Sequence, residues 1–344
     1  MYFTKWKTIA ILLFCFLLTL LASPSFIDFK YLPNFLNNKI NYGLDLRGGV
    51  QLLLKVDFDT YMQEQMDITS NFIRKTLRKK KIRYSNLKSN QKQISFSIKD
   101  TTSTQTIKKI IFGIDKNLQS KFESENISIS YPSNIQENFK TNLINQTIEI
   151  IRHRIDETGT LEPSIQRQGN LSILLQAPGI YEPAQLKRIL GKTAKLSFHL
   201  VNEEASIDEA LNGIIPPGNK LLAGESNKEQ HKTWYIIKEN IAVAGDLLTN
   251  AQLTTDTGPM VAFNFNSLGA KLFADVTRKN IGKRLAIVLD NKVISAPVIN
   301  EPILSGSGTI SGNFTISSAN ELALLLRAGA LPAPVSIIEE KIVG

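Results

Sequence analysis

The sequence predicts an α+β protein with an N-terminal transmembrane helix, a ferredoxin-like (βαββαβ) base and an inserted α+β lobe. Three observations predict it. No charged residue lies between Lys7 and Asp28. Residues 50–131 then alternate between strand and helix periodicity in the order βαββαβ. Residues 203–260 change to a loop-rich composition, which is typical of the start of an inserted lobe. A chain of 344 residues is long enough for two or three such units.

The uncharged N-terminal stretch supplies roughly the 20 residues that cross a hydrocarbon core of about 30 Å. Lys5 and Lys7 precede it, so the positive-inside rule places the N-terminus in the cytoplasm and the residues after about 28 on the far side of the membrane. We therefore expect residues 1–28 to be a cytoplasmic N-terminus and a transmembrane anchor. A cleaved signal peptide is the competing interpretation, because residues 9–22 have the length of an h-region.

The first predicted unit covers residues 50–131. Val50, Leu52 and Leu54 alternate as in a half-buried strand, and the glycines before them permit a tight turn. Apolar residues at helical spacing follow. The expected elements are strand 50–57, helix 59–80, strand 82–88, strand 93–98, helix 104–120 and strand 126–131.

The second predicted unit covers residues 135–202. Its first helix carries an isoleucine stripe that includes Ile144, Ile151 and Ile155, and Gly159 follows its end. The opening strand of this unit is expected to be shared or borrowed. The expected elements are helix 135–157, strands 161–168 and 171–177, helix 182–190 and strand 194–201. Together the two units form a predicted base over residues 40–202.

The inserted lobe is predicted over residues 203–311, with a return to the base over 312–344. Asp290-Asn291 predicts a hairpin turn. The run "LSGSGTISG" is interpreted as a Gly/Ser joint, with Gly306, Gly308 and Gly312 as candidate joint glycines. Ser318 and Glu321 form a capping-box pattern that opens a last helix, and Gly329 ends it.

Charge and cysteine content exclude some partners and some structures. The net charge of +9 arises from 40 basic and 31 acidic residues. The densest basic run, residues 74–83, lacks interleaved aromatics and ends an amphipathic helix, so we interpret it as a solvated helix end rather than a nucleic-acid site. Acidic lipid headgroups are the next candidate partner. The single cysteine, Cys15, can form no internal disulfide.

The sequence contains no complete pattern typical of a catalytic site. Gly191-Lys192-Thr193 ends like a phosphate-binding loop, but Leu186 stands where the earlier glycine is required. The three histidines, His153, His199 and His231, lie in separate segments without metal-ligand spacing. We therefore expect no catalytic residue, no metal and no cofactor, and we favour binding or mechanical work.

The segment "YGLDLRGGVQLLLKVD", residues 42–57, resembles the signature that follows the first membrane helix of the SecD family, an accessory part of the bacterial Sec protein-export machinery. Further matching segments occur in the family's order: "IIRHRIDETGTLEPSIQRQGNLSILLQAPGI", "LGKTAKLSFHL", "TRKNIGKRLAIVLDNKVISAPVI" and "ELALLLRAGALPAPVSIIEE". The signature loop, interpreted as a structural junction between anchor and base, contains Gly43, Asp45, Arg47, Gly48 and Gly49.

The resemblance implies a periplasmic base with a head inserted into it. In the family the head moves relative to the base and is thought to capture emerging preprotein. The implied partners are SecF, the SecYEG channel, the membrane and unfolded preprotein, with YajC and YidC as further candidates and no nucleic acid. The family continues into membrane helices that carry a proton path, whereas this sequence ends at Gly344, so we expect a fragment, a truncated product or half of a split subunit.

Two alternatives remain open. A membrane-anchored periplasmic enzyme or small-molecule binding protein would need a deep, closed pocket with converging carboxylates, whereas a transport role predicts an open groove between lobes. An inert gene remnant is the third interpretation. The strand and helix patterns that persist through Glu340 favour retained folding.

Overall fold

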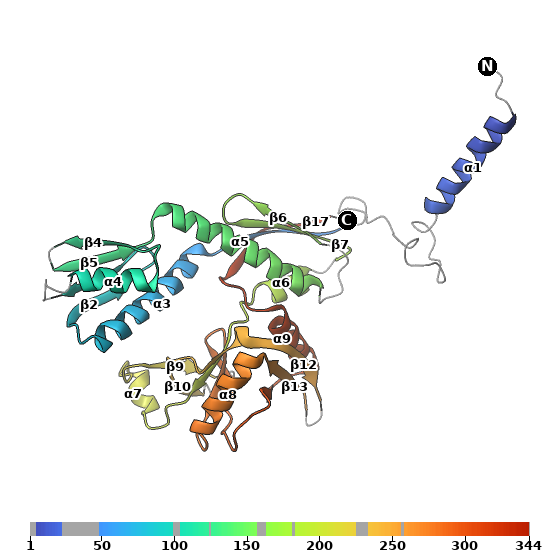
Figure 1. Ribbon diagram of the computed structural model, residues 1–344. Helices are drawn as coiled ribbons and strands as arrows, with labels where there is room; N and C mark the ends of the chain where they lie inside the picture. Colours follow the sequence, from blue (N-terminus) through green and yellow to red (C-terminus); the bar gives the residue numbers. More distant parts are fainter. Residues whose placement is uncertain are drawn as a thin grey trace.

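The computed structural model describes residues 5–22, 48–98, 104–123, 125–156, 163–180, 183–224, 233–255 and 258–343. Beyond the N-terminal helix, these residues form two lobes (Figure 1). We call residues 48–190 and 331–343 the first lobe and residues 194–328 the second lobe. The chain passes between them twice, at residues 191–193 and 329–330.

The N-terminal helix α1 spans Lys5–Ala22. Among the residues that the structure describes, no helix combines the length and the apolar character needed to cross a membrane. The anchor predicted over residues 1–28 therefore stays a prediction.

The first lobe contains a four-stranded antiparallel sheet in the order β17 (Val335–Val343), β1 (Gly49–Val56), β7 (Ser172–Pro178), β6 (Ser164–Gln168). Alternate residues of β1, including Leu52 and Leu54, are fully buried, as its period-two pattern predicts. Helices α5 (Ser133–Asp156) and α6 (Pro183–Leu190) pack beside this sheet (Figure 1). Strand β1 thus joins chain segments from opposite ends of the sequence.

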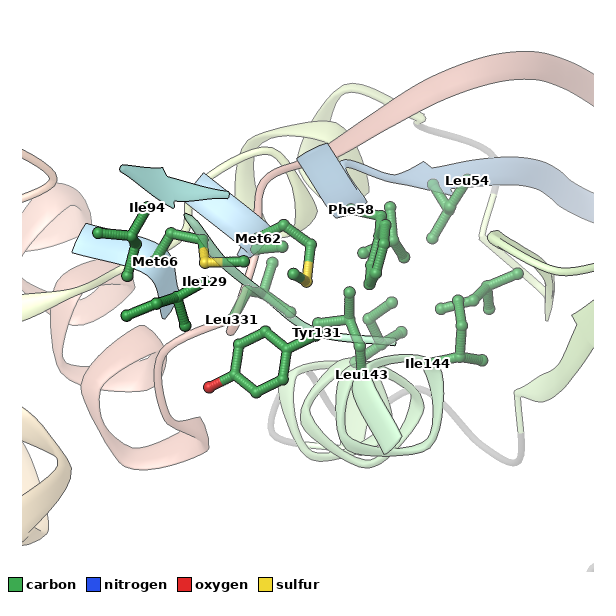
Figure 2. Packing of buried hydrophobic residues seen from close by; sticks show 14 of the residues in the cluster. Leu54, Phe58, Met62, Met66, Ile94, Ile129, Tyr131, Leu143, Ile144 and Leu331 are labelled. Atoms are coloured by element: carbon green, nitrogen blue, oxygen red, sulfur yellow. The ribbon is translucent and has the colours of Figure 1, made fainter. Parts of the chain in front are cut away.

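A second four-stranded sheet completes the first lobe, in the order β2 (Tyr84–Ser89), β3 (Ile94–Ile98), β5 (Asn126–Ser130), β4 (Gln119–Glu123). Helices α3 (Phe58–Lys79) and α4 (Thr104–Ile114) accompany it. Buried side chains from α3, α5 and the returning chain meet in one core, where Leu331 points toward Met62, Tyr131 and Leu143 (Figure 2).

The single βαββαβ sheet predicted over residues 50–131 is wrong in its pairing. Strand β1 pairs with β7 and β17 and leaves the sheet of β2–β5. The second unit does borrow β1 as its opening strand. Helix α4 also ends six residues earlier than predicted, at Ile114, because Asp115 accepts a hydrogen bond from the Asn117 amide in a tight turn. Strand β4 follows that turn and was not predicted.

The second lobe has a sheet ordered β11 (Val243–Ala244), β8 (Leu196–Leu200), β14 (Leu285–Leu289), β15 (Lys292–Ser295). A second sheet is ordered β12 (Leu248–Thr254), β13 (Met260–Phe265), β16 (Ser307–Ile310), and a hairpin joins β9 (Asn219–Ala223) to β10 (Trp234–Lys238). Its helices are α7 (Ile207–Leu211), α8 (Ser267–Lys279) and α9 (Ile316–Ala328), with a 3-10 turn at Gly245–Leu247.

A cluster of phenylalanine rings forms the centre of the second lobe. The ring of Phe198 lies 5.5 Å from those of Phe263 and Phe265 and 5.7 Å from that of Phe273, measured between centroids. Strand β14 is apolar on both faces because this cluster covers one face and residues of β9 and β10 cover the other. The predicted hairpin on Asp290-Asn291 is confirmed: β14 pairs with β15, and both turn residues have positive φ.

The structure places both boundaries between the lobes at other residues than the sequence predicts. Strand β8 was expected in the base but pairs with β11 and β14 of the second lobe. Helix α9 was expected in the return to the base, yet its buried face packs into the second lobe beside β12. Its N-cap residue, Thr315, lies three residues before the predicted cap because Thr315 and Ser318 form the capping box, whereas Gly329 does end the helix. The inserted segment therefore runs from about residue 194 to 328 rather than from 203 to 311.

Candidate functional site

An open cleft of about 1110 Å³ lies between the two lobes. Helix α3 of the first lobe forms one wall, opposite the β9–β10 hairpin of the second (Figure 1). Thr193 of the first connection, the second connection and residues 331–334 also line it. The cleft is thus bounded by both lobes and by both of the segments that join them.

Helix α3 presents polar side chains to the cleft and apolar ones to the core. Its amphipathic pattern buries Met62, Met66 and Ile73 and leaves Glu64 and Asp67 on the cleft side. Asp57 caps the helix by accepting hydrogen bonds from the Thr60 amide and hydroxyl, and these bonds lower the pKa of its carboxyl. The first-lobe wall is therefore a charged, preformed surface.

The opposite wall adds apolar surface. Leu222, Ile237 and Val288 form its buried part, and Ile215 and Ile241 line the cleft with 39% and 50% of their surfaces exposed. Exposed apolar side chains beside an open groove are typical of surfaces that contact other molecules. This wall can therefore bind apolar groups.

His199 is a buried titratable group behind the cleft. Its Nδ1 lies 2.8 Å from the Lys238 carbonyl oxygen and its Nε2 lies 3.0 Å from the Ser197 hydroxyl. Burial lowers the pKa of His199, and the hydrogen bond to the Lys238 carbonyl opposes that effect. The ring therefore links β8 to the end of β10 in its neutral form.

Arg154, the last buried polar residue of α5, holds the joint between the lobes. Its guanidinium donates to the carbonyl oxygens of Ile189 at 2.7 Å, Lys192 at 2.5 Å, Thr193 at 3.0 Å and Gly329 at 3.1 Å. Side-chain burial is complete. Burial lowers the pKa of Arg154 to about 10, and the charge of Asp290 opposes this, so the group is cationic at neutral pH.

Asp290 binds the same connection from the opposite side. Its carboxylate accepts hydrogen bonds from the backbone amides of Ala194 at 3.0 Å and Lys195 at 2.9 Å, and from the Thr193 hydroxyl. Ala194 has φ +59°, a left-handed conformation that non-glycine residues seldom adopt. The first connection is therefore held at the Lys192 and Thr193 carbonyls by the first lobe and at the Thr193 hydroxyl by the second, whose first two amides Asp290 also binds.

The predicted signature loop is only partly described. Gly43, Asp45 and Arg47 lie outside the described residues. Gly48 and Gly49 have positive φ values of 68° and 139°, and the Gly48 carbonyl accepts a hydrogen bond from the Gly179 amide at 3.0 Å. These two glycines therefore begin β1 in a conformation that side chains disfavour.

The predicted joint at Gly306, Gly308 and Gly312 is misplaced. A Cβ on Gly306 would lie 2.3 Å from that of Ala270, and one on Gly308 would lie 2.7 Å from the Phe263 ring. These two glycines allow close packing inside the second lobe, and Gly312 also lies within it, next to Phe314. The actual connections lie at residues 191–193 and 329–330.

The sequence analysis assigned no role to Arg154 or Asp290 at the connection between the lobes, and none to His199 behind the cleft. One signal was available for Arg154: residues 144, 147, 151 and 154 follow the 3-4-3 spacing of a buried helix face, and all are buried. A charged residue on that face is a sign of a specific partner. No group of three His, Cys, Asp or Glu side chains is placed to hold a metal ion in the described part of the chain.

The fold and the joint define an α+β domain in which one lobe is inserted into another. Family models match residues 35–59 (SecD/SecF GG motif), residues 144–203 (SecDF P1 domain, N-terminal part) and residues 220–333 (SecDF P1 head subdomain). A solved structure of SecDF in a super-membrane-facing form has a TM-score of 0.52 and 25% identity, and covers 98% of this chain and 35% of its own.

Protein translocase subunits SecD from several bacteria are similar over the whole chain. The Rickettsia felis protein is 47% identical over 99% of this chain and 66% of its own, and the Acetobacter pasteurianus protein is 36% identical over 100% and 67%. The chain belongs to the SecD family of protein translocase subunits. It spans about 66% of the length of its Rickettsia relatives.

Proposed function

We propose that this chain is the anchored, periplasmic part of a translocase subunit that binds unfolded preprotein in the cleft between its lobes. The observation that carries the proposal is the open cleft of about 1110 Å³, in which the exposed apolar side chains of Ile215 and Ile241 lie among polar and charged ones. Unfolded chains expose apolar side chains beside a polar backbone. A cleft with both kinds of surface can bind such a polypeptide whatever its sequence.

The size and openness of the cleft favour a polypeptide over a small molecule. Pockets that enclose small ligands measure about 300–1,000 Å³ and bury most of the ligand. Several cleft carboxylates also have partners already: Glu64 pairs with Lys195 at 2.6 Å, and Asp67 accepts a hydrogen bond from Ser89. The enzyme alternative, which needs converging free carboxylates, is therefore disfavoured.

The proposed setting follows the SecD family. The uncharged stretch after Lys7 would anchor the chain in the inner membrane with its N-terminus in the cytoplasm. SecF and the SecYEG channel would be the partners, with YajC and YidC as further candidates. Coupling to the proton gradient would require membrane helices of the kind found in the full-length family.

Photo-crosslinking to a stalled export substrate tests the proposal. A crosslinking amino acid at Ile241, in the cleft, should capture the substrate several-fold more often than one at Ile338 on strand β17, which is similarly exposed but lies outside the cleft. Membranes that contain the chain and the channel provide the setting. Equal capture at both positions, or no capture at Ile241 in a folded protein, would overturn the proposal.

A further inference from the structure

We propose that Arg154 is a positioning residue that stabilises the lobe arrangement of this structure and so sets the width of the cleft in that arrangement. Its guanidinium reaches carbonyl groups of the first lobe, of the first connection and of the start of the second connection. Gly329 is 175 residues from Arg154 in sequence, whereas Ile189 and Thr193 are 35 and 39 residues away. The inference concerns the lobe geometry alone, so it holds or fails without any client.

The ends of two helices explain why a charge is buried at this place. Ile189 belongs to the last turn of α6, and Gly329 follows the last residue of α9. Carbonyl groups at helix C-termini are unpaired within the helix and carry partial negative charge. One planar guanidinium, with donors in a fixed fork, binds the C-terminal ends of one helix from each lobe.

The second connection is tied to the first at the same point. The Leu331 amide donates to the Thr193 carbonyl at 2.8 Å, and Arg154 donates to that same carbonyl at 3.0 Å. Asp290 holds the neighbouring amides from the second lobe. A change in the angle between the lobes that moves either connection away from Arg154 would break bonds to a buried cation, which is unfavourable because those donors would lose their partners out of reach of water.

The other polar links across the joint are weaker. Lys192 pairs with Glu321 at 2.9 Å and Lys195 pairs with Glu64 at 2.6 Å, but the lysine side chains are 52% and 56% exposed. Exposed ion pairs contribute little because water competes for both charges. The rigidity of the joint is accordingly assigned to Arg154 and Asp290.

Distance measurement between spin labels tests the proposal on the full chain without client. Cys15 is replaced by Ser, and labelled cysteines are placed at Asn71 on α3 and Asn291 on the second lobe, which are both exposed cleft residues. We expect a narrow distance distribution for the parent. Arg154→Lys keeps the charge but loses the fork, and it should widen the distribution at least twofold.

Two controls separate positioning from general damage. Arg152→Lys changes an exposed arginine of the same helix, which pairs with Glu149, and should leave the distribution unchanged. A label pair within the first lobe, at Asn71 and Lys109, should keep its width in every variant. Widening of this inner pair by Arg154→Lys to the same degree would overturn the proposal, because it would show loss of the lobe's own fold.

A variant at Asp290, on the second-lobe side of the joint, provides a second test of the same proposal. Asp290→Asn removes the carboxylate that binds the connection from the second lobe, and it should also widen the interlobe distribution. If Arg154→Lys does not fold, this variant decides the question. An interlobe distribution as narrow as that of the parent, in whichever of the two variants folds, would contradict the proposal.

Discussion

The two lobes differ in the number of chain segments from which they are built. The first lobe is assembled from two distant segments, because its central strand β1 pairs with β7 on one side and with β17, near the other end of the chain, on the other. The second lobe is one continuous insertion with its own aromatic core. The second lobe therefore has the features of a separate cooperative unit, whereas the first lobe depends on the returning strand β17.

The largest effect is expected from Phe198→Ala in the aromatic core. Phe198 is completely buried and contacts three other phenylalanine rings, so its truncation should destabilise the second lobe by about 4 kcal/mol. Hydrogen exchange resolved by segment should show faster exchange in β8, β13 and β14 and little change in β1 or β7. Phe112→Ala, at a residue that is 60% exposed, serves as the control. An equal increase in amide exchange in both lobes would show that the second lobe does not unfold as a separate unit.

A smaller effect is expected from Gly306→Ala. The added Cβ would lie 2.3 Å from the Cβ of Ala270, and the residue has φ +68°, so we expect a loss of about 2 kcal/mol in the second lobe. Gly282→Ala is the matched control, because Gly282 has φ +81° with no atom near the new Cβ. Thermal unfolding of both variants separates backbone strain from steric overlap. Equal losses would show that the close approach to α8 has no energetic role.

The smallest effect at neutral pH is expected from His199→Gln. Burial holds the pKa of His199 in the folded state below its unfolded value of 6.5, so the unfolded state binds the proton first as the pH falls. The second lobe should therefore lose stability below about pH 6.5, and the variant should lose less. Unfolding by urea at pH 7 and pH 5 measures this difference. His153→Gln, at an exposed position of α5, is the matched control for the change of residue type.

Local patterns were sufficient to predict several elements. The spacing of Met62, Met66 and Ile73 predicted α3 and its buried face, and the isoleucine stripe predicted α5. In each pattern the apolar residues lie on one face of a single helix, so a short stretch of sequence is enough to predict that helix.

The remaining features depend on contacts between distant segments. The pairing of β1 with β17 joins the two ends of the first lobe, and no pattern within either strand specifies its partner. Arg154 finds its acceptors in segments that are more than thirty residues away, as Ile189, Lys192 and Thr193 show. The glycine pattern at 306–312 gave the wrong location because glycine serves close packing as well as flexibility.

Hydrogen exchange of the full chain, with and without a reduced, unfolded polypeptide, tests the central claim most directly. If the cleft binds the client, amides on both of its walls, in α3 and in the β9–β10 hairpin, should exchange more slowly when the polypeptide is present. The sheet of β2, β3, β5 and β4 provides an internal reference. Slower exchange confined to that sheet, or no change in either wall at saturating polypeptide, would contradict the account.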